Sequence, residues 1–148
     1  KPMPLIIGSR ASLSMIAASV NEMAESLMDK FWPGPLTLLL KAKEGLSSCL
    51  TADTGRVAVR IPGESFALHL AREAGFPITA TSANPSGMPP AEDADAVIRY
   101  FGKEVDMVID GGRTAGGLPS TIVDAAGESI KIVREGVIPR SVFEKPRS

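Results

Sequence analysis

The sequence predicts an α/β fold with a mixed parallel and antiparallel sheet. Short apolar runs alternate with segments of helical periodicity, proline and glycine stand between them, and two β-rich runs follow each other near the end. Alternating strands and helices favour parallel pairs, whereas two adjacent strands favour an antiparallel pair. We therefore expect a twisted mixed sheet with flanking helices.

The first elements follow from the spacing of apolar residues. Residues 4–7 form a short apolar run, which is typical of a buried strand. From about Ala11 to Lys30, apolar residues recur at steps of three or four, which predicts one helix that Ser9 could cap. The sequence "WPGP" at residues 32–35 ends this helix, because proline lacks an amide proton and fixes its own backbone angle.

The middle of the chain repeats the alternation. "LTLLLKA" predicts a second strand, followed by a polar loop over residues 43–56, and "VAVRI" at residues 57–61 predicts a third. A helix fits residues 64–74, with Gly75 where a C-cap belongs. The stretch "PITAT" supplies the next strand.

The last third begins with a helix and ends in strands. Acidic residues near position 93 favour a helix start, and Gly102 favours its end. "VDMVID", "STIVDA" and "SIKIVRE" each predict a strand. The 148 residues fit one domain with one core.

Composition excludes several classes of protein. Hydrophobic residues make up 44% of the chain, yet no apolar run is long enough for a membrane span. A single cysteine excludes an intramolecular disulfide and, with a single histidine, makes a zinc site improbable. The 16 basic and 17 acidic residues argue against a dedicated nucleic-acid binder, which usually has a basic excess.

Polar side chains collect where the predicted strands end. Arg60 and Arg134 come at strand ends, Ser82 and Asn84 follow another strand, and Ser120 begins one. Open α/β sheets bind ligands in a crevice beside strand ends, and arginine matches phosphate or carboxylate oxygens. The same residues also have simpler interpretations: a solvated arginine, or a plain turn at "TSANPSG".

The chain shows no motif for covalent catalysis. It has no GxSxG elbow and no cysteine–histidine pair, and its glycine-rich segment "DGGRTAGG" does not match a phosphate loop. Asp53, Asp110 and Asp124 could hold Mg²⁺, but aspartates near turns usually bond to the backbone. Nucleotidyl transfer, which depends mainly on positioning and charge neutralisation, remains compatible with these residues.

Six motifs in order resemble the YrdC/TsaC family of threonylcarbamoyl-AMP synthases: "KPMPLII", "FWPGPLTLLL", "VAVRIP", "ITATSANPSG", "PSTIVD" and "IVREG". The resemblance runs from Lys1 to about Gly136. It implies a YrdC-like sheet around a concave ligand cleft. It also implies synthesis of threonylcarbamoyl-AMP and pyrophosphate from L-threonine, bicarbonate and ATP with Mg²⁺, for the threonylcarbamoyladenosine modification of tRNA.

The resemblance also implies two sets of site residues, with no catalytic side chain and no metal ligand among them. The ATP-binding set is Lys1, Arg56, Ser82, Asn84 and Arg134. The threonine-binding set is Arg60, the Ala80 backbone and Ser120. Arg56 stands where relatives often carry a threonine that faces the nucleotide.

One departure from the family concerns the N-terminus. Relatives carry a segment before the "KP" motif that helps to bind threonine and nucleotide, so we expect residues 1–148 to be a single YrdC-like domain that is N-terminally incomplete. A cytoplasmic enzyme with downstream tRNA-modification partners, no membrane association and a weak tRNA or double-stranded RNA contact is the family expectation. The alternatives are a non-catalytic RNA-binding module using the same cleft and, last, a carbamoyltransferase relative.

Overall fold

The computed structural model describes residues 1–144 and divides into two compact units. Unit 1 comprises Lys1–Ala80 and Leu118–Ser148, and unit 2 comprises Thr81–Gly117. Each unit is described below by itself. The interpretation of one domain over residues 1–148 stays a prediction, because a compact unit need not fold independently.

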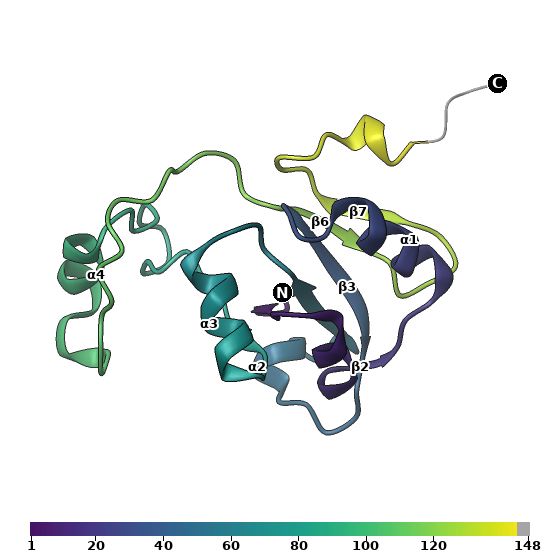
Figure 1. The fold of residues 1–148 in the computed structure, drawn as a ribbon, viewed down its shortest axis with the longest axis horizontal. Coiled ribbons are helices and arrows are strands. Elements are labelled where there is room, and N and C mark those ends of the chain that lie inside the picture. The colour runs from purple at the N-terminus through teal and green to yellow at the C-terminus, as the bar shows by residue number, and fades with distance from the viewer. Residues whose placement is uncertain (145–148) are drawn as a thin grey trace. The chain divides into compact units, whose positions relative to one another are not determined.

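Unit 1 contains a seven-stranded mixed sheet (Figure 1). Its order is β5-β1-β4-β3-β6-β7, and β2 pairs with the far end of β3. The pairs β1/β4 and β3/β6 are parallel, and the other pairs are antiparallel, as the alternation of elements predicts. The strands are β1 Pro4–Ile6, β2 Ala17–Ser19, β3 Leu36–Ala42, β4 Arg56–Arg60, β5 Ile78–Thr79, β6 Thr121–Asp124 and β7 Lys131–Arg134.

The α-helices begin and end at residues suited to those positions. Asn21 and Ser65 accept hydrogen bonds from backbone amides at the starts of α1 and α3, and Gly75 ends α3 in the left-handed conformation. The helices are α1 Glu22–Phe31, α2 Ser48–Thr51 and α3 Phe66–Ala74 in unit 1, and α4 Ala94–Phe101 in unit 2, with short 3-10 turns at Arg10–Met15, Gly102–Glu104 and Arg140–Val142.

The long helix predicted from Ala11 to Lys30 is wrong. The segment instead forms the 3-10 turn Arg10–Met15, the short strand β2 and the helix α1. Ala17 and Ser19 pair with the end of β3, and Asn21 caps a new helix. The apolar spacing is real, but pairing with a distant strand and a strong capping residue outweigh it.

Two further predictions need correction. "VDMVID" forms no strand, because residues 105–110 lie in unit 2, are mostly exposed and pair with no strand among the described residues. The polar loop predicted over residues 43–56 contains α2, which Ser47 caps and which packs Leu50 against the core. The predicted ends of α3 at Gly75 and of α4 at Gly102 are confirmed.

One face of the sheet packs against the helices of unit 1. Val57 and Val59 of β4 point to this face, as do Leu38 and Leu40 of β3, because side chains alternate along a strand. They form the main hydrophobic core with Ala24, Leu27 and Met28 of α1 and Leu68 of α3. The core therefore lies between this face and the helices.

The opposite face carries a different set of side chains. Arg56, Ala58 and Arg60 alternate onto it from β4, and the register places Ile122 of β6 beside Thr37 and Arg134. Its small apolar cluster consists of Leu39, Ala58 and Ile122. Among the described residues, no helix of unit 1 contributes to this cluster. Because Arg56, Arg60 and Arg134 lie on this side of the sheet, we call it the polar face.

Candidate functional site

Three of the predicted site residues come together at one end of the polar face. Arg60 is the last residue of β4, Ser120 directly precedes β6, and Arg134 ends β7. Arg134 donates from Nε and Nη2 to the Ser120 carbonyl oxygen, at 3.2 and 2.8 Å. Because β4 runs antiparallel to β3 and β6 parallel to it, these strand ends meet at one edge of the sheet.

Thr37 belongs to the same cluster, although the sequence analysis did not select it. It is only 2% exposed, and its Oγ1 lies 2.8 Å from Ser120 Oγ. The available signal was a single hydroxyl within the apolar run "LTLLL". We call Thr37, Arg60, Ser120 and Arg134 the arginine cluster.

Among residues 1–144, positive charge in the arginine cluster has no acidic counterpart. Burial, and after it the positive charge of Arg134, lower the pKa of Arg60 below the usual value. Within residues 1–144, no carboxylate lies within 4 Å of either guanidinium. Two partly buried cations without a carboxylate partner among the described residues favour an external carboxylate or phosphate as their partner.

The backbone after β7 passes close to the backbone that leads into β6, and hydrogen bonds hold the two segments together. Thr121 Oγ1 accepts from the amides of Gly136 and Ile138 and donates to the Ile138 carbonyl at 2.7 Å. A Cβ on Gly136 would clash with the Pro119 carbonyl oxygen and lie 2.7 Å from the Ser120 carbonyl carbon. Glycine at this position therefore allows the chain after Arg134 to pass directly against Ser120.

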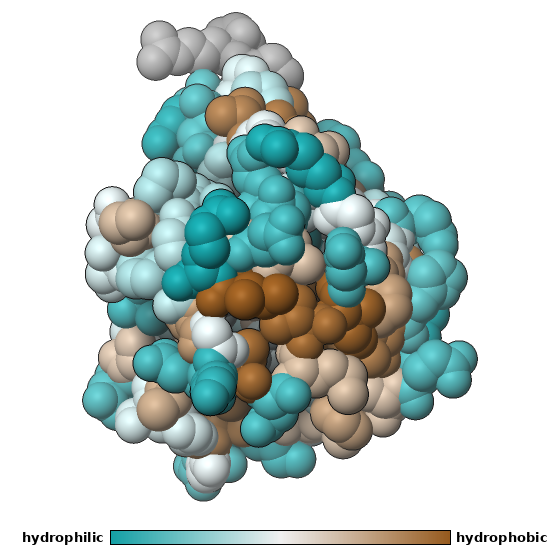
Figure 2. All heavy atoms as spheres, turned by 90° about the vertical axis from the view of Figure 1, so that its left-hand side faces the viewer, coloured by the Kyte–Doolittle hydropathy of each residue, from teal (hydrophilic) through white to brown (hydrophobic). Residues whose placement is uncertain are grey.

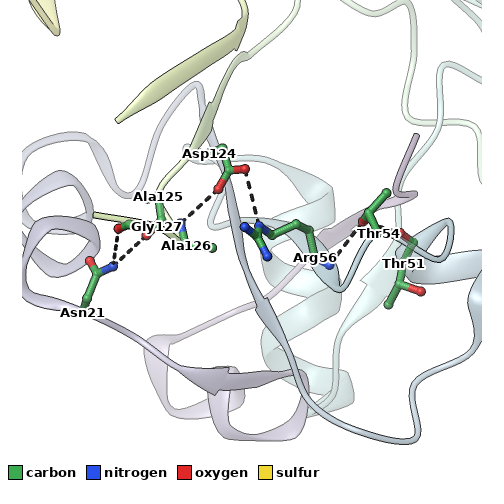
Figure 3. Close-up of polar contacts among 8 residues, drawn as sticks. All are labelled: Asn21, Thr51, Thr54, Arg56, Asp124, Ala125, Ala126 and Gly127. Atoms are coloured by element: carbon green, nitrogen blue, oxygen red, sulfur yellow. Dashed lines mark hydrogen bonds and ion pairs between the residues drawn. The ribbon is translucent and has the colours of Figure 1, made fainter. Parts of the chain in front are cut away.

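A second cluster lies at the other end of β4. Arg56 Nε lies 3.4 Å from Asp124 Oδ2, and Asp124 Oδ1 accepts from the Ala126 amide (Figure 3). A cavity of about 180 Å³ opens here, lined by Arg56, Asp124, Gly127, Glu128, Ser129 and Lys131. Since β-strands rise about 3.3 Å per residue, Arg56 and Arg60 lie about 13 Å apart along the same face.

Asn21 fixes the turn that forms one wall of this cavity. Its side-chain amide donates to the carbonyls of Ala125 and Gly127, at 2.9 and 3.3 Å (Figure 3). Its Oδ1 accepts from the Ala24 amide and so caps α1. Asn21 and Asp124 were not predicted as site residues, although Asp124 was considered as a Mg²⁺ ligand. In the structure, Asp124 accepts hydrogen bonds from Arg56 and from the Ala126 amide.

Lys1 lies toward the Arg56 end of the sheet, whereas Ala80 lies level with Ala58 in the middle of β4. Lys1 is exposed and precedes β1, which runs parallel to β4. The Ala80 amide donates to the Pro4 carbonyl at 2.9 Å, just after β5. Neither residue joins the arginine cluster through a hydrogen bond.

Ser82 and Asn84 belong to unit 2 and form their own local network. Ser82 Oγ donates to Asn84 Oδ1, and the Asn84 amide donates to the carbonyls of Pro85 and Met88, each at 2.9 Å. Ala83 between them has a φ of 51°, a conformation that residues other than glycine rarely adopt. Such strain concentrates at functional loops.

The surface chemistry of unit 2 differs from that of a nucleic-acid binder. Residues 81–117 contain three basic and six acidic residues. Several hydrophobic side chains of unit 2 are exposed, among them Ile98 and Met107 at 52% and 78%. Figure 2 shows hydrophobic side chains gathered near the middle of one face of the molecule, with hydrophilic ones around them.

Residues 1–144 contain neither a membrane-spanning helix nor a cluster of metal-binding side chains. None of their helices is long and apolar enough to cross a bilayer. Within the same residues, no three side chains of histidine, cysteine, aspartate or glutamate gather as a metal site would require.

Comparison with known proteins relates the chain to one family. Residues 1–136 match the Sua5/YciO/YrdC family, described as telomere recombination. The threonylcarbamoyl-AMP synthase of Pyrococcus abyssi (strain GE5 / Orsay) is 38% identical over 144 residues, which cover 97% of this chain and 42% of that protein. The threonylcarbamoyl-AMP synthase of Bacillus subtilis (strain 168) is 37% identical with the same coverage.

A solved structure supports the fold. The crystal structure of P. abyssi Sua5 complexed with L-threonine superposes with a TM-score of 0.86 at 37% identity, covering 96% of this chain and 42% of that one. The mixed sheet with flanking helices is therefore the fold of these relatives. The chain spans less than half the length of the two synthases that it resembles.

Proposed function

Because the chain belongs to the Sua5/YciO/YrdC family, we propose that it carries the catalytic domain of a threonylcarbamoyl-AMP synthase. The reaction joins L-threonine, bicarbonate and ATP into threonylcarbamoyl-AMP and releases pyrophosphate and water. The names of the relatives and the L-threonine complex of P. abyssi Sua5 support this activity.

The observation that carries the proposal is the arginine cluster. Arg60 and Arg134 are partly buried, their charge is unpaired by carboxylates within residues 1–144, and the Ser120 hydroxyl lies beside Arg134. Arg60 and Ser120 would bind the carboxylate of L-threonine, and the Ala80 backbone stays the third predicted threonine contact. Arg134 would neutralise charge on ATP.

The remaining predicted residues would bind the nucleotide. Arg56 at the other end of the polar face and the exposed Lys1 would contact ATP. Ser82 and Asn84 of unit 2 stay predicted nucleotide-binding residues. The distance of about 13 Å between the two ends of β4 suits an elongated ligand, such as an amino acid joined to an adenylate.

The chemistry needs no nucleophile from the protein. The amine of L-threonine and bicarbonate form a carbamate with loss of water. A carbamate oxygen attacks the α-phosphorus of ATP, and the bond to pyrophosphate breaks. The protein binds and orients the reactants and balances their charge, which is a sufficient catalytic strategy for transfer at phosphorus.

Mg²⁺ would enter with the nucleotide. This ion commonly binds through substrate phosphates, waters and one or two carboxylates rather than through a full set of protein ligands. When bound, Mg²⁺ would neutralise phosphate charge.

The cellular setting follows from the same proposal. The adenylate would pass to enzymes that form threonylcarbamoyladenosine in tRNA, and the protein would act in the cytoplasm. A weak contact with tRNA or double-stranded RNA remains part of the family expectation. Unit 2 has more acidic than basic residues, which favours the enzyme over a dedicated RNA-binding module.

The decisive experiment incubates the 148-residue chain with ATP, Mg²⁺, L-threonine and ¹³C-bicarbonate, with mass spectrometry for threonylcarbamoyl-AMP. The product is expected to be heavier by one mass unit than with ordinary bicarbonate. An Arg60→Met variant is the matched control and is expected to form none.

If the 148-residue chain forms no labelled product, either alone or joined to a segment such as relatives carry before the "KP" motif, the proposed activity is wrong. In that case, salt-dependent tRNA binding by either form would support the RNA-binding module instead.

A further inference from the structure

We propose that Thr37 is a positioning residue that makes the Ser120 hydroxyl an obligate hydrogen-bond donor toward a bound oxyanion. The inference builds on the proposed function, in which Ser120 binds the carboxylate of L-threonine. It rests on the arrangement of donors and acceptors around two hydroxyl groups.

Thr37 has a single partner for its hydroxyl. The group is buried, and within residues 1–144 its one hydrogen bond joins it to Ser120 Oγ at 2.8 Å. A hydroxyl carries one proton and two lone pairs. Leaving the proton unpaired in a buried position costs more than leaving a lone pair unpaired, so Thr37 donates to Ser120.

Ser120 Oγ then receives donors on both of its lone pairs. One is the Thr37 proton, and the other is Arg134 Nη2 at 3.4 Å. Arg134 is fixed there by its two stronger bonds to the Ser120 carbonyl oxygen. Arginine has no acceptor atom, so it cannot take the Ser120 proton.

The Ser120 proton therefore has no acceptor among the described residues. It is available to an oxygen atom of a ligand on the polar face. Arg60, whose side chain alternates onto the same face, supplies positive charge for that oxygen. The cluster consequently selects an acceptor, such as a carboxylate or phosphate oxygen, and disfavours an amine or amide nitrogen.

A double-mutant cycle tests this role. Thr37→Val keeps the volume of the side chain and removes the hydroxyl, and Thr37→Ser restores it. Binding of L-threonine and of inorganic phosphate to the 148-residue chain is measured by calorimetry for wild type, Thr37→Val, Ser120→Ala and the double variant. We expect Thr37→Val to weaken binding about tenfold, consistent with one lost hydrogen bond, and Thr37→Ser to restore most of it.

The critical comparison is made in the Ser120→Ala background. If Thr37 acts through Ser120, Thr37→Val causes no further loss of affinity once Ser120 is alanine. If its effect is merely structural, its loss of affinity adds to the loss caused by Ser120→Ala. Unchanged binding by Thr37→Val, or fully additive losses, overturns the inference and leaves the proposed function intact.

The two ligands separate this inference from the proposed function. The chain could bind phosphate with the same non-additive loss of affinity and not bind threonine. That result supports the donor role of Ser120 and shows that the arginine cluster is not the threonine site. A wild-type chain that binds neither ligand overturns the donor inference, whereas the labelled-product experiment decides the proposed function.

Discussion

The guanidinium groups of Arg60 and Arg134 repel each other electrostatically at one end of the polar face. Burial is the larger cause and Arg134 the second cause of the lowered pKa of Arg60. An anion bound between them would relieve both effects. We therefore expect the cluster to favour an anionic ligand and to lower the stability of the free protein.

Replacing Arg60 by methionine is expected to stabilise the free chain and to abolish L-threonine binding. The folded-state pKa lies below the unfolded value, so the charged form opposes folding, and at pH 7 this cost is fully present. Removing it should raise the free energy of unfolding by about 0.5–1 kcal/mol. Thermal denaturation and calorimetry measure the two effects.

The exposed Arg99 of unit 2 provides the matched control, because Arg99→Met should change neither quantity. An Arg60→Met variant that unfolds at a lower temperature and still binds threonine would contradict this account.

Gly136→Ala is expected to lower the free energy of unfolding by about 2 kcal/mol, because the new Cβ would be forced against the backbone of Pro119 and Ser120. Threonine and ATP binding should weaken as well, since Arg134 and Ser120 would be displaced. Gly63→Ala serves as control, because a Cβ there meets no atom within 4 Å. Equal urea midpoints for the two variants would show that the close approach is unimportant.

Asn21→Ala should lower the free energy of unfolding by about 2 kcal/mol. It removes the cap of α1 and two hydrogen bonds to the turn at residues 125–127. Asp93→Ala removes only the cap of α4 and should cost about 1 kcal/mol. A difference near zero between these two variants in chemical denaturation would mean that the turn is held by other contacts.

Asp124→Asn is expected to strengthen ATP binding severalfold and to steepen its salt dependence, because it frees the charge of Arg56. Stability should hardly change, since the pair is partly exposed and joined at 3.4 Å by one nitrogen. Arg56→Gln should act in the opposite direction. If nucleotide titrations find both variants equal to wild type, Arg56 does not contact the nucleotide.

Local sequence determined much of the architecture. The strand "LTLLLKA", the closely paired last strands and the glycine that ends α3 were all predictable, because alternation, proline stops and left-handed caps are properties of neighbouring residues. The presence of Arg60, Ser120 and Arg134 at strand ends was readable for the same reason.

Only the tertiary structure decided which strand ends meet. Strand order and direction bring Thr37 to Ser120 across 83 positions of sequence and Asp124 to Arg56 across 68. The same long-range pairing broke the predicted helix over residues 11–30. The donor direction at Ser120 likewise depends on burial and partner geometry, which exist only after the sheet has assembled.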